Sequence, residues 1–318
     1  MIGIKIQNKS IIDRHFRAFK DFLSNTKKIK YDYDELNRWI HSITNDQYNL
    51  EDVIKATPKE MINIIIQERN TGIDFRTKVK GKHTNYEKSQ YFLYLYKKFS
   101  TREDKHFTRV IGYNALKLVE SLGINVCPYC NRNFINNTKL VDKNNNPYIK
   151  RMAQLDHFYP GSQFPYLAVS FFNLIPVCGS CNIVKLDDHL GVNPYEILNS
   201  DDHLIFDYTF EESVNEYTID TTYMSNYFYV NWNKLGLNEL YKIHNNYLHD
   251  LLFRIKIYNL FYRKDIENYF NKWGINSNEE TLTKEDFERI ILGNNFLETD
   301  LSNYPLSKLT KDIVRQYK

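Results

Sequence analysis

Cys127-Pro128-Tyr129-Cys130 and Cys178-Gly179-Ser180-Cys181 are two C-x-x-C motifs separated by 47 residues. Together they contain all four cysteines of the 318-residue chain. Two C-x-x-C turns can direct four thiolates at one point, which is the ligand set of a tetrahedral zinc ion. Because a Cys₄ set leaves no coordination position open, we expect this zinc to be structural. The motifs therefore predict a small metal-stabilised module in the middle of the chain.

Redox chemistry is the alternative for paired cysteines. The C-P-Y-C motif is similar to the glutaredoxin active site, which needs a reactive thiolate at a helix N-terminus in a βαβ setting. The segment upstream of Cys127 has a helical pattern instead, and a redox site would leave the second C-x-x-C without a function. In a reducing compartment the two pairs also argue against a disulfide framework.

Composition is that of a folded protein, with 42% apolar and 25% charged residues. It excludes intrinsic disorder and collagen-like structure. No apolar run approaches the ~18 residues that a bilayer span requires, and residues 1–10 lack the apolar segment of a secretory signal. We therefore expect a cytoplasmic protein without a membrane partner.

Charge is distributed unevenly along the chain. Residues 1–150 contain 27 lysines and arginines against 16 acidic residues, whereas residues 151–318 contain 15 against 23. A basic half can bind a polyanion by neutralising its phosphates, but basic residues can equally just solvate helix faces. Arg76, Lys78, Lys80 and Lys82 alternate, which in an extended segment would place all four on one side.

Hydrophobic periodicity predicts a mainly α protein with a small α+β insert. Residues 1–123 form a basic helical region, 124–200 the metal-stabilised module, and 201–318 an acidic helical region. In the first region, Thr57-Pro58-Lys59-Glu60 has the capping-box pattern of a helix start and Gly72 is a natural stop. A further helix is predicted from about Glu103 to Leu122. Residues 136–147 have turn composition.

The C-terminal region is predicted to be helical from about Leu237 onward. Leu248, Leu251 and Leu252 recur at helical spacing. Thr283-Lys284-Glu285-Asp286 has the pattern of another capped helix start.

Several polar residues lie between the cysteine motifs and just beyond them. Asp156-His157 precedes Pro160, Asn173-Leu174 follows, and Asn182 and Lys185 come directly after the second C-x-x-C. In this order, over residues 124–195, the sequence resembles the HNH endonucleases, which have a ββα-metal fold. The resemblance implies a first strand ending at Asp156-His157, a second over 172–177 and a helix from about Asn182, which would bring Asn182 opposite Asp156.

The side-chain chemistry suits phosphodiester hydrolysis. His157 can accept a proton near neutral pH, while Asp156 and Asn182 offer oxygen ligands to Mg²⁺ or Mn²⁺. The resemblance implies that His157 is the general base and that Asp156 and Asn182 bind the catalytic ion. It also implies that Asn173 holds the loop bearing the base or orients His157, and that Lys185 faces a phosphate.

Each of these residues also has a simpler interpretation. Asp156-His157 could be a surface pair, Asn173 a turn residue, Asn182 a helix N-cap and Lys185 a solvated lysine. Many HNH enzymes have histidine where Asn182 stands, and an amide can bind metal but cannot transfer a proton. His189, after two aspartates, is either an additional ligand or part of a solvated turn; the turn is the preferred interpretation.

The wider sequence is similar to the HNH nuclease subunits of Septu-type antiphage defence systems. The similar features are Asn193-Pro194-Tyr195, the long helical flanks and Pro305-Leu306-Ser307-Lys308-Leu309. This resemblance implies an ATPase partner and a nucleic-acid substrate, with DNA favoured over RNA. The leading hypothesis is a metal-dependent HNH endonuclease that leaves 5′-phosphate and 3′-hydroxyl ends. The alternatives are a zinc-containing nucleic-acid-binding module without catalysis and a thiol oxidoreductase.

Overall fold

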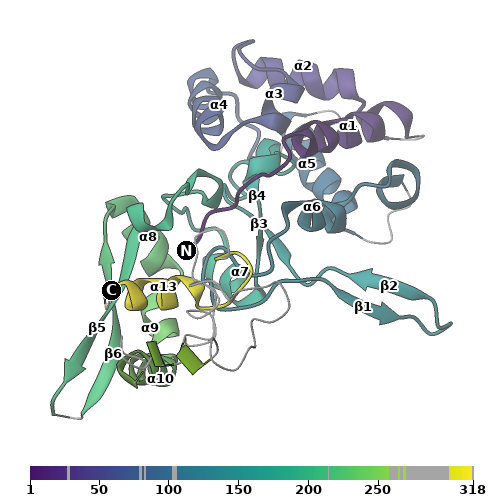
Figure 1. Ribbon diagram of the computed structural model, residues 1–318. Coiled ribbons are helices and arrows are strands. Elements are labelled where there is room, and N and C mark those ends of the chain that lie inside the picture. Colours follow the sequence, from purple (N-terminus) through teal and green to yellow (C-terminus); the bar gives the residue numbers. More distant parts are fainter. Residues whose placement is uncertain are drawn as a thin grey trace.

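The computed structural model describes residues 1–26, 29–78, 81, 84–101, 106–213, 215–257, 264–265, 268–269 and 301–316. Roughly half of these residues are helical, and the strands form three separate two-stranded antiparallel sheets. In Figure 1 the sheet β3–β4 lies in the middle, between the N-terminal helices and the C-terminal elements. The predicted mixture of helices with a small strand-containing part is therefore confirmed at this coarse level.

The N-terminal region consists of helices that bury one apolar face each. They are α1 (Ser10–Asn25), α2 (Tyr33–Ile43), α3 (Leu50–Lys55), α4 (Pro58–Thr71), α5 (Asn85–Ser100), η1 (His106–Ile111) and α6 (Ala115–Leu122). The predicted start and stop of α4 are confirmed. Thr57 and Glu60 form the capping box, Pro58 is the first helical residue, and Gly72 adopts the left-handed conformation that ends the helix.

The single helix predicted from about Glu103 to Leu122 is wrong. Within the described residues, η1 ends at Ile111 and α6 begins only at Ala115. Gly112 has a φ of 68°, outside the helical range, and the Asn114 side chain accepts a hydrogen bond from the Lys117 amide as the N-cap of α6. The chain therefore turns between two helices, although Gly123 does end α6 as predicted.

The middle of the chain contains two short hairpins and a helix. Strand β1 (Thr138–Val141) pairs with β2 (Pro147–Lys150), β3 (Gln154–His157) pairs with β4 (Leu174–Val177), and α7 (Gly179–Lys185) follows β4. The prediction of a loop over 136–147 is wrong for β1. The turn itself lies at residues 142–146, where the Asp142 carboxylate accepts hydrogen bonds from the Asn144 and Asn146 amides.

The boundaries of β4 and α7 also differ from the expected ones. Phe172 and Asn173 belong to the short helix η3 (Phe171–Asn173), so β4 begins at Leu174. Helix α7 begins at Gly179, three residues before Asn182. The cause is the second C-x-x-C motif, because its turn is already the first turn of the helix.

The C-terminal region begins with strands rather than helices, which corrects the prediction for its first residues. Its elements, with the short helices that precede them, are η4 (Pro194–Glu196), η5 (Ser200–Asp202), β5 (Leu204–Glu211), β6 (Glu216–Tyr223), α8 (Asn226–Lys234), α9 (Leu237–Lys242), α10 (Asn245–Ile257) and α13 (Ser307–Arg315). Leu248, Leu251 and Leu252 are buried on α10 as expected. The capped start at residues 283–286 lies outside the described residues, as do Lys80 and Lys82.

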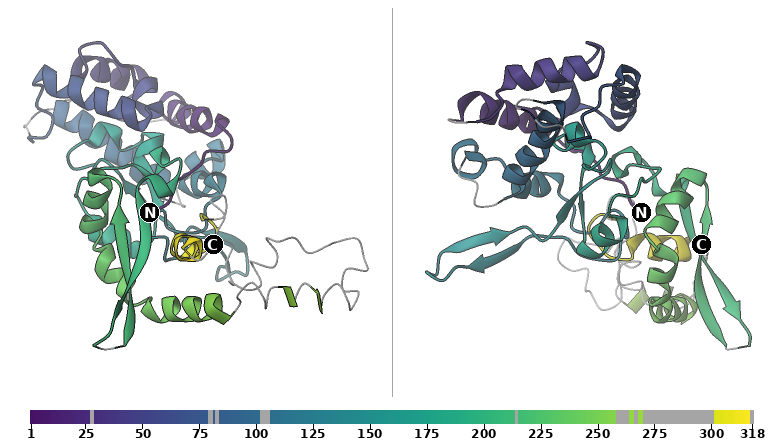
Figure 2. Two further views of the ribbon diagram at one scale, coloured as in Figure 1. Left: turned by 60° about the vertical axis from the view of Figure 1, so that its left-hand side comes forward. Right: turned by 180° about the vertical axis from the view of Figure 1, so that it is seen from behind.

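The N-terminus and residues 301–308 pack against the first C-x-x-C motif and Asn131, which follows it, and Figures 1 and 2 show the N-terminus close to α13. The Ile2 amide donates to the Pro128 carbonyl at 2.9 Å. The buried Asn131 side chain donates to the Leu301 carbonyl at 3.0 Å and accepts from the Lys308 amide at 3.0 Å. Two segments far apart in sequence are thus held against one turn. No helix among the described residues has the length and apolar character to cross a membrane.

Candidate active site and metal centre

The four cysteines form one buried cluster. Cys127 and Cys130 precede β1, Cys178 lies just before α7, and Cys181 lies within it. All four are free thiols, and their sulfur atoms lie within 4.8 Å of one another. Among the described residues they are the one group of three or more His, Cys, Asp or Glu side chains that could hold a metal ion.

The geometry of the cluster fits zinc. Sulfurs bound tetrahedrally at the usual Zn–S distance of ~2.3 Å are ~3.8 Å apart, and Cys130 Sγ and Cys178 Sγ are 3.9 Å apart. The Arg132 amide and the Asn133 side chain donate to Cys130 Sγ and Cys178 Sγ at 3.4 and 3.3 Å. Such N–H donors stabilise thiolates that bind a metal. The cluster can therefore hold a metal ion such as zinc, as the sequence predicted.

Tyr129, inside the first C-x-x-C motif, connects this cluster to Asp156. Its hydroxyl is buried and donates to Asp156 Oδ2 at 2.7 Å. Burial raises the pKa of Tyr129 well above its ordinary value, so the hydroxyl keeps its proton for this bond. Sequence reasoning did not single out Tyr129. The available signal was its position between two metal ligands, where the backbone direction is fixed.

Lys185 occupies the other side of the Asp156 carboxylate. Its fully buried Nζ lies 3.2 Å from Asp156 Oδ1 and donates to the His157 carbonyl at 2.8 Å. Burial raises the pKa of Asp156 to about 6, although the Lys185 charge acts in the opposite direction. The simpler interpretation of Lys185 as a solvated lysine is wrong. Its predicted role at a phosphate stays a prediction. Its contacts in this structure are with the Asp156 carboxylate and the His157 backbone carbonyl.

His157 lies at the end of β3 and has a defined ring orientation. Its Nε2 is 2.9 Å from the Ala168 carbonyl oxygen. Because a carbonyl only accepts, Nε2 carries the proton, and Nδ1 of the neutral ring is left as an acceptor. The ring also packs against Tyr96 of α5 with a centroid distance of 4.3 Å. Burial lowers the pKa of His157 to about 4, which keeps the imidazole neutral at physiological pH.

Asn173 holds the loop that follows His157. Its fully buried amide accepts from the Tyr159 amide at 2.7 Å and donates to the Tyr159 and Leu167 carbonyls at 3.2 and 2.9 Å. The loop so fixed continues to Ala168, whose carbonyl orients His157. Of the two roles implied for Asn173, these contacts correspond to holding the loop, since no hydrogen bond joins its amide to His157.

Asn182 joins Asp156 and His157 in the lining of one cavity of about 540 Å³. The rest of the lining is Tyr96, Leu155, Pro160, Gly161, Leu186 and Asp187. The Asn182 amide nitrogen donates to Gln154 Oε1 at 2.7 Å, which leaves its oxygen as a possible metal ligand. Asp156 and Asn182 could supply two oxygen ligands, with other positions taken by water or phosphate. Gly161 lies close to the His157 ring, because a Cβ there would be 3.8 Å from His157 Nδ1.

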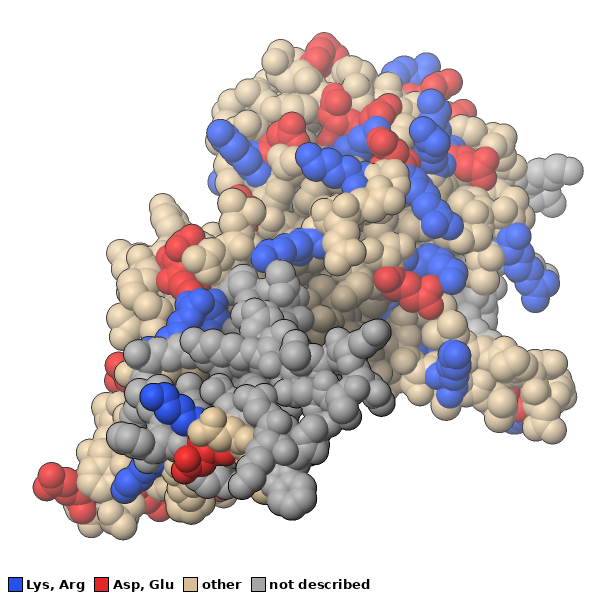
Figure 3. Space-filling model, in the orientation of Figure 1, with Lys and Arg blue, Asp and Glu red and all other residues tan. Residues whose placement is uncertain are grey.

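Other predicted residues lie outside this cavity. The exposed His189 is bonded to Gln163 Oε1 at 2.7 Å, consistent with the preferred interpretation of a polar turn. Arg76 forms an ion pair with the buried Glu68 and packs over the Phe75 ring, so its contacts stabilise the fold. Lysine and arginine side chains are interspersed with acidic ones over the N-terminal helices in Figure 3. That face therefore offers no continuous basic surface.

Comparison with protein-family profiles, curated proteins and solved structures finds no match to this chain.

Proposed function

We propose that the protein is a metal-dependent endonuclease of the HNH type, with a structural zinc and a catalytic Mg²⁺ or Mn²⁺. The observation that carries the proposal is the convergence of Asp156, His157 and Asn182 on one cavity. They come from the end of β3 and from α7, which are joined through β4. An antiparallel pair followed by a helix, with acid and base at the strand end, is what the motif resemblance implies.

His157 would act as the general base. With Nε2–H hydrogen-bonded to the Ala168 carbonyl, Nδ1 is the ring atom that can take a proton from water. The neutral state favoured by burial is the one a base requires. A divalent ion held by Asp156 and Asn182 would stabilise the charge that develops on the phosphate and the leaving oxygen.

Lys185 and Tyr129 would position Asp156. Each bonds a different carboxylate oxygen, at 3.2 and 2.7 Å, so the carboxylate cannot rotate away from the cavity. Zinc at the four cysteines would fix Tyr129 and α7 together. The structural metal would thereby support the active site without taking part in chemistry.

The proposed cellular role rests on the sequence resemblance to Septu-type nucleases. It comprises antiphage defence in the cytoplasm, with an ATPase partner and a nucleic-acid substrate, DNA being favoured over RNA. Asn193 and Tyr195, two residues of that resemblance, donate to the backbone carbonyls of Phe172 and Leu174. Through these bonds they support η3 and β4, next to the candidate active site.

A zinc-containing nucleic-acid-binding module without catalysis is the second candidate. One observation favours it: both Asp156 oxygens already have partners, and a catalytic ion would have to share them. The thiol oxidoreductase has less support, because four clustered sulfurs exceed what a dithiol site needs.

The test compares the parent protein with two histidine variants on supercoiled plasmid DNA and on total RNA, with and without Mg²⁺ or Mn²⁺. We expect the parent to cut only with the ion, His157→Ala to abolish cutting with zinc content intact, and His189→Ala to cut like the parent. Products should carry ligatable 5′-phosphate ends. Equal cutting by His157→Ala would refute the assignment, and salt-sensitive binding without any scission would establish the second candidate.

A further inference from the structure

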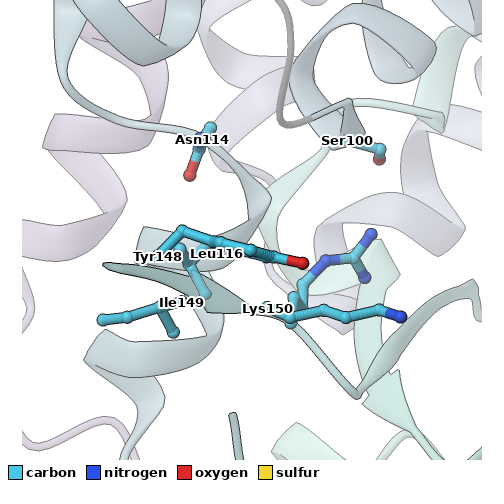
Figure 4. Close-up of a pocket in the computed structure, with 7 residues that line it drawn as sticks. Ser100, Asn114, Leu116, Tyr148, Ile149 and Lys150 are labelled. Carbon is cyan, nitrogen blue, oxygen red and sulfur yellow. The ribbon is translucent and has the colours of Figure 1, made fainter. Parts of the chain in front are cut away.

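A second cavity, of about 260 Å³, lies between the N-terminal helices and the β1–β2 hairpin. It is lined by Ser100, Asn114, Leu116, Tyr148, Ile149, Lys150 and Arg151. In Figure 4, Tyr148, Ile149 and Lys150 lie on one side, and Asn114 and Ser100 face them from the other. The cavity is near the lower end of the size range for small-ligand sites, about 300 to 1,000 Å³, so it suits one small unit.

Arg151 supplies a largely buried positive charge to this cavity. One guanidinium nitrogen donates to the Ala153 carbonyl at 2.6 Å. No carboxylate pairs with Arg151 among the described residues. Burial lowers its pKa, which reflects the cost of holding the charge away from water. A guanidinium has five N–H donors, so most of the Arg151 N–H groups are available to bind an anion. The exposed Lys150 adds a second cation at the rim.

The opposite wall contains a polar atom without a satisfactory partner. The Ser100 hydroxyl oxygen is buried and makes no hydrogen bond of normal geometry, although it lies close enough to the Tyr96 hydroxyl to lower that group's pKa. Buried polar atoms are normally paired by protein, water or ligand. The Ser100 oxygen has almost no accessible surface, so the donors that a phosphate oxygen can reach are those of Arg151 and, at the rim, Lys150.

Apart from the Asn114 amide, the remaining lining is largely apolar. Leu116, Ile149 and the ring of Tyr148 provide the kind of surface on which a nucleobase packs. A cavity with cationic and apolar walls matches a nucleotide, which has a phosphate at one end and a flat base at the other. It matches inorganic phosphate less well, because that ion would leave the apolar wall uncovered.

Tyr96 connects this cavity with the candidate active site. Its ring lines the active-site cavity against His157, and Ser100 lies one turn further along α5. The Tyr96 hydroxyl donates to the Leu155 carbonyl at 2.8 Å, on the segment that leads from Arg151 to Asp156. A ligand in the second cavity would thus be connected to His157 through two residues of α5, Ser100 and Tyr96.

We propose that this cavity binds one nucleotide, with its phosphate on Arg151 and its base against Tyr148 and Leu116. The nucleotide is either a unit of the strand being cut or a free nucleotide. The first case rests on the proposed nuclease function, and the second does not.

The experiment measures binding to the His157→Ala protein without added divalent ions, so that the strand stays intact. One probe is a short fluorescein-labelled single-stranded DNA, followed by anisotropy, and the other is adenosine 5′-monophosphate, followed by calorimetry. The test variant is Arg151→Gln. The matched control is Lys139→Gln, which removes the same charge from an exposed position on the same hairpin outside the cavity.

We expect Arg151→Gln to weaken DNA binding about tenfold and to reduce the slope of log affinity against log salt by about one. Lys139→Gln should change affinity less than about twofold. Loss of nucleotide binding with unchanged DNA binding would support the cavity and identify the source as a free nucleotide. Unchanged binding of both probes in Arg151→Gln, or no binding of either by the His157→Ala protein, would overturn the inference.

Two further measurements keep the outcome decisive. Zinc content and thermal midpoint check folding, and if Arg151→Gln does not fold, Lys150→Gln at the exposed rim must weaken binding of at least one probe or the inference fails. Cutting by the otherwise unaltered protein is measured separately. If the protein cuts nucleic acid but Arg151→Gln binds both probes normally, only the proposed binding role of the cavity is refuted. If Arg151→Gln loses nucleotide binding but the parent protein does not cut, only the proposed nuclease function is refuted.

Discussion

Replacing Asn173 by alanine tests whether the loop beside His157, the proposed general base, is held as described. The change removes one acceptor and two donor interactions, at 2.7, 3.2 and 2.9 Å, from a fully buried position. The Leu167 carbonyl keeps a second partner, the Ser170 amide. The Tyr159 amide and carbonyl have no other partner among the described residues. Two unpaired backbone groups at ~1 to 3 kcal/mol each give a loss of about 3 kcal/mol after partial relaxation.

Urea unfolding measured by tryptophan fluorescence would determine the loss. We expect a lower midpoint with an unchanged dependence on urea concentration, because the surface exposed on unfolding stays the same. Asn182→Ala is the control for stability, since its amide is partly exposed and makes one hydrogen bond, to Gln154. It should lose less than about 1 kcal/mol.

The functional consequence is measured well below the unfolding midpoint. With the loop loosened, the Ala168 carbonyl no longer fixes the His157 ring, so cutting should fall more than the folded fraction does. Zinc content should be unchanged. A loss of stability of less than about 1 kcal/mol, together with cutting at the rate of the parent protein, would refute both the role of Asn173 in holding the loop and the connection of that loop to His157.

Two further changes test other parts of the fold. Cys181→Ser should remove bound zinc and expose the chain to proteolysis near residue 130, which metal analysis and limited trypsin digestion would detect; full zinc content would contradict the four-sulfur site. Burial lowers the pKa of His15 to about 4 from its ordinary 6.5, so protons bind preferentially to the unfolded chain. His15 alone should therefore lower the stability by about 3 kcal/mol as the pH falls from 6.5 to 4, and His157 should add to this loss. His15→Gln should flatten that part of the pH profile in urea titrations, and an unchanged profile would contradict the explanation.

Features set by local spacing were predictable from the sequence. The four cysteines form one cluster because each C-x-x-C turn presents both sulfurs on the same side. The α4 boundaries follow from Thr57, Pro58 and Gly72, whose conformational preferences act within one turn of the helix.

The motif resemblance led us to expect Asn182 near Asp156, but the burial of other polar side chains by contacts between distant segments was not predicted. Lys185 of α7 and Tyr129 of the first C-x-x-C turn are polar residues that are buried against Asp156 of β3. Likewise, the environment of Arg151 arises only when the hairpin packs on α5 and α6. Strand β5 was also not predicted from the sequence, although its buried residues Leu204 and Phe206 alternate along the chain.

The packing of Ile2 on Pro128, and of Asn131 on Leu301 and Lys308, has a consequence for the protein's biosynthesis. A ribosome delivers residues 301–316 after every other element described here. Until then, the Asn131 side-chain amide lacks its hydrogen-bond partners, and the turn bearing Cys127 and Cys130 lacks the support that this segment gives. Chains that terminate before residue 301 would therefore be left with an incompletely supported centre, and the cell's proteases would encounter them in that state.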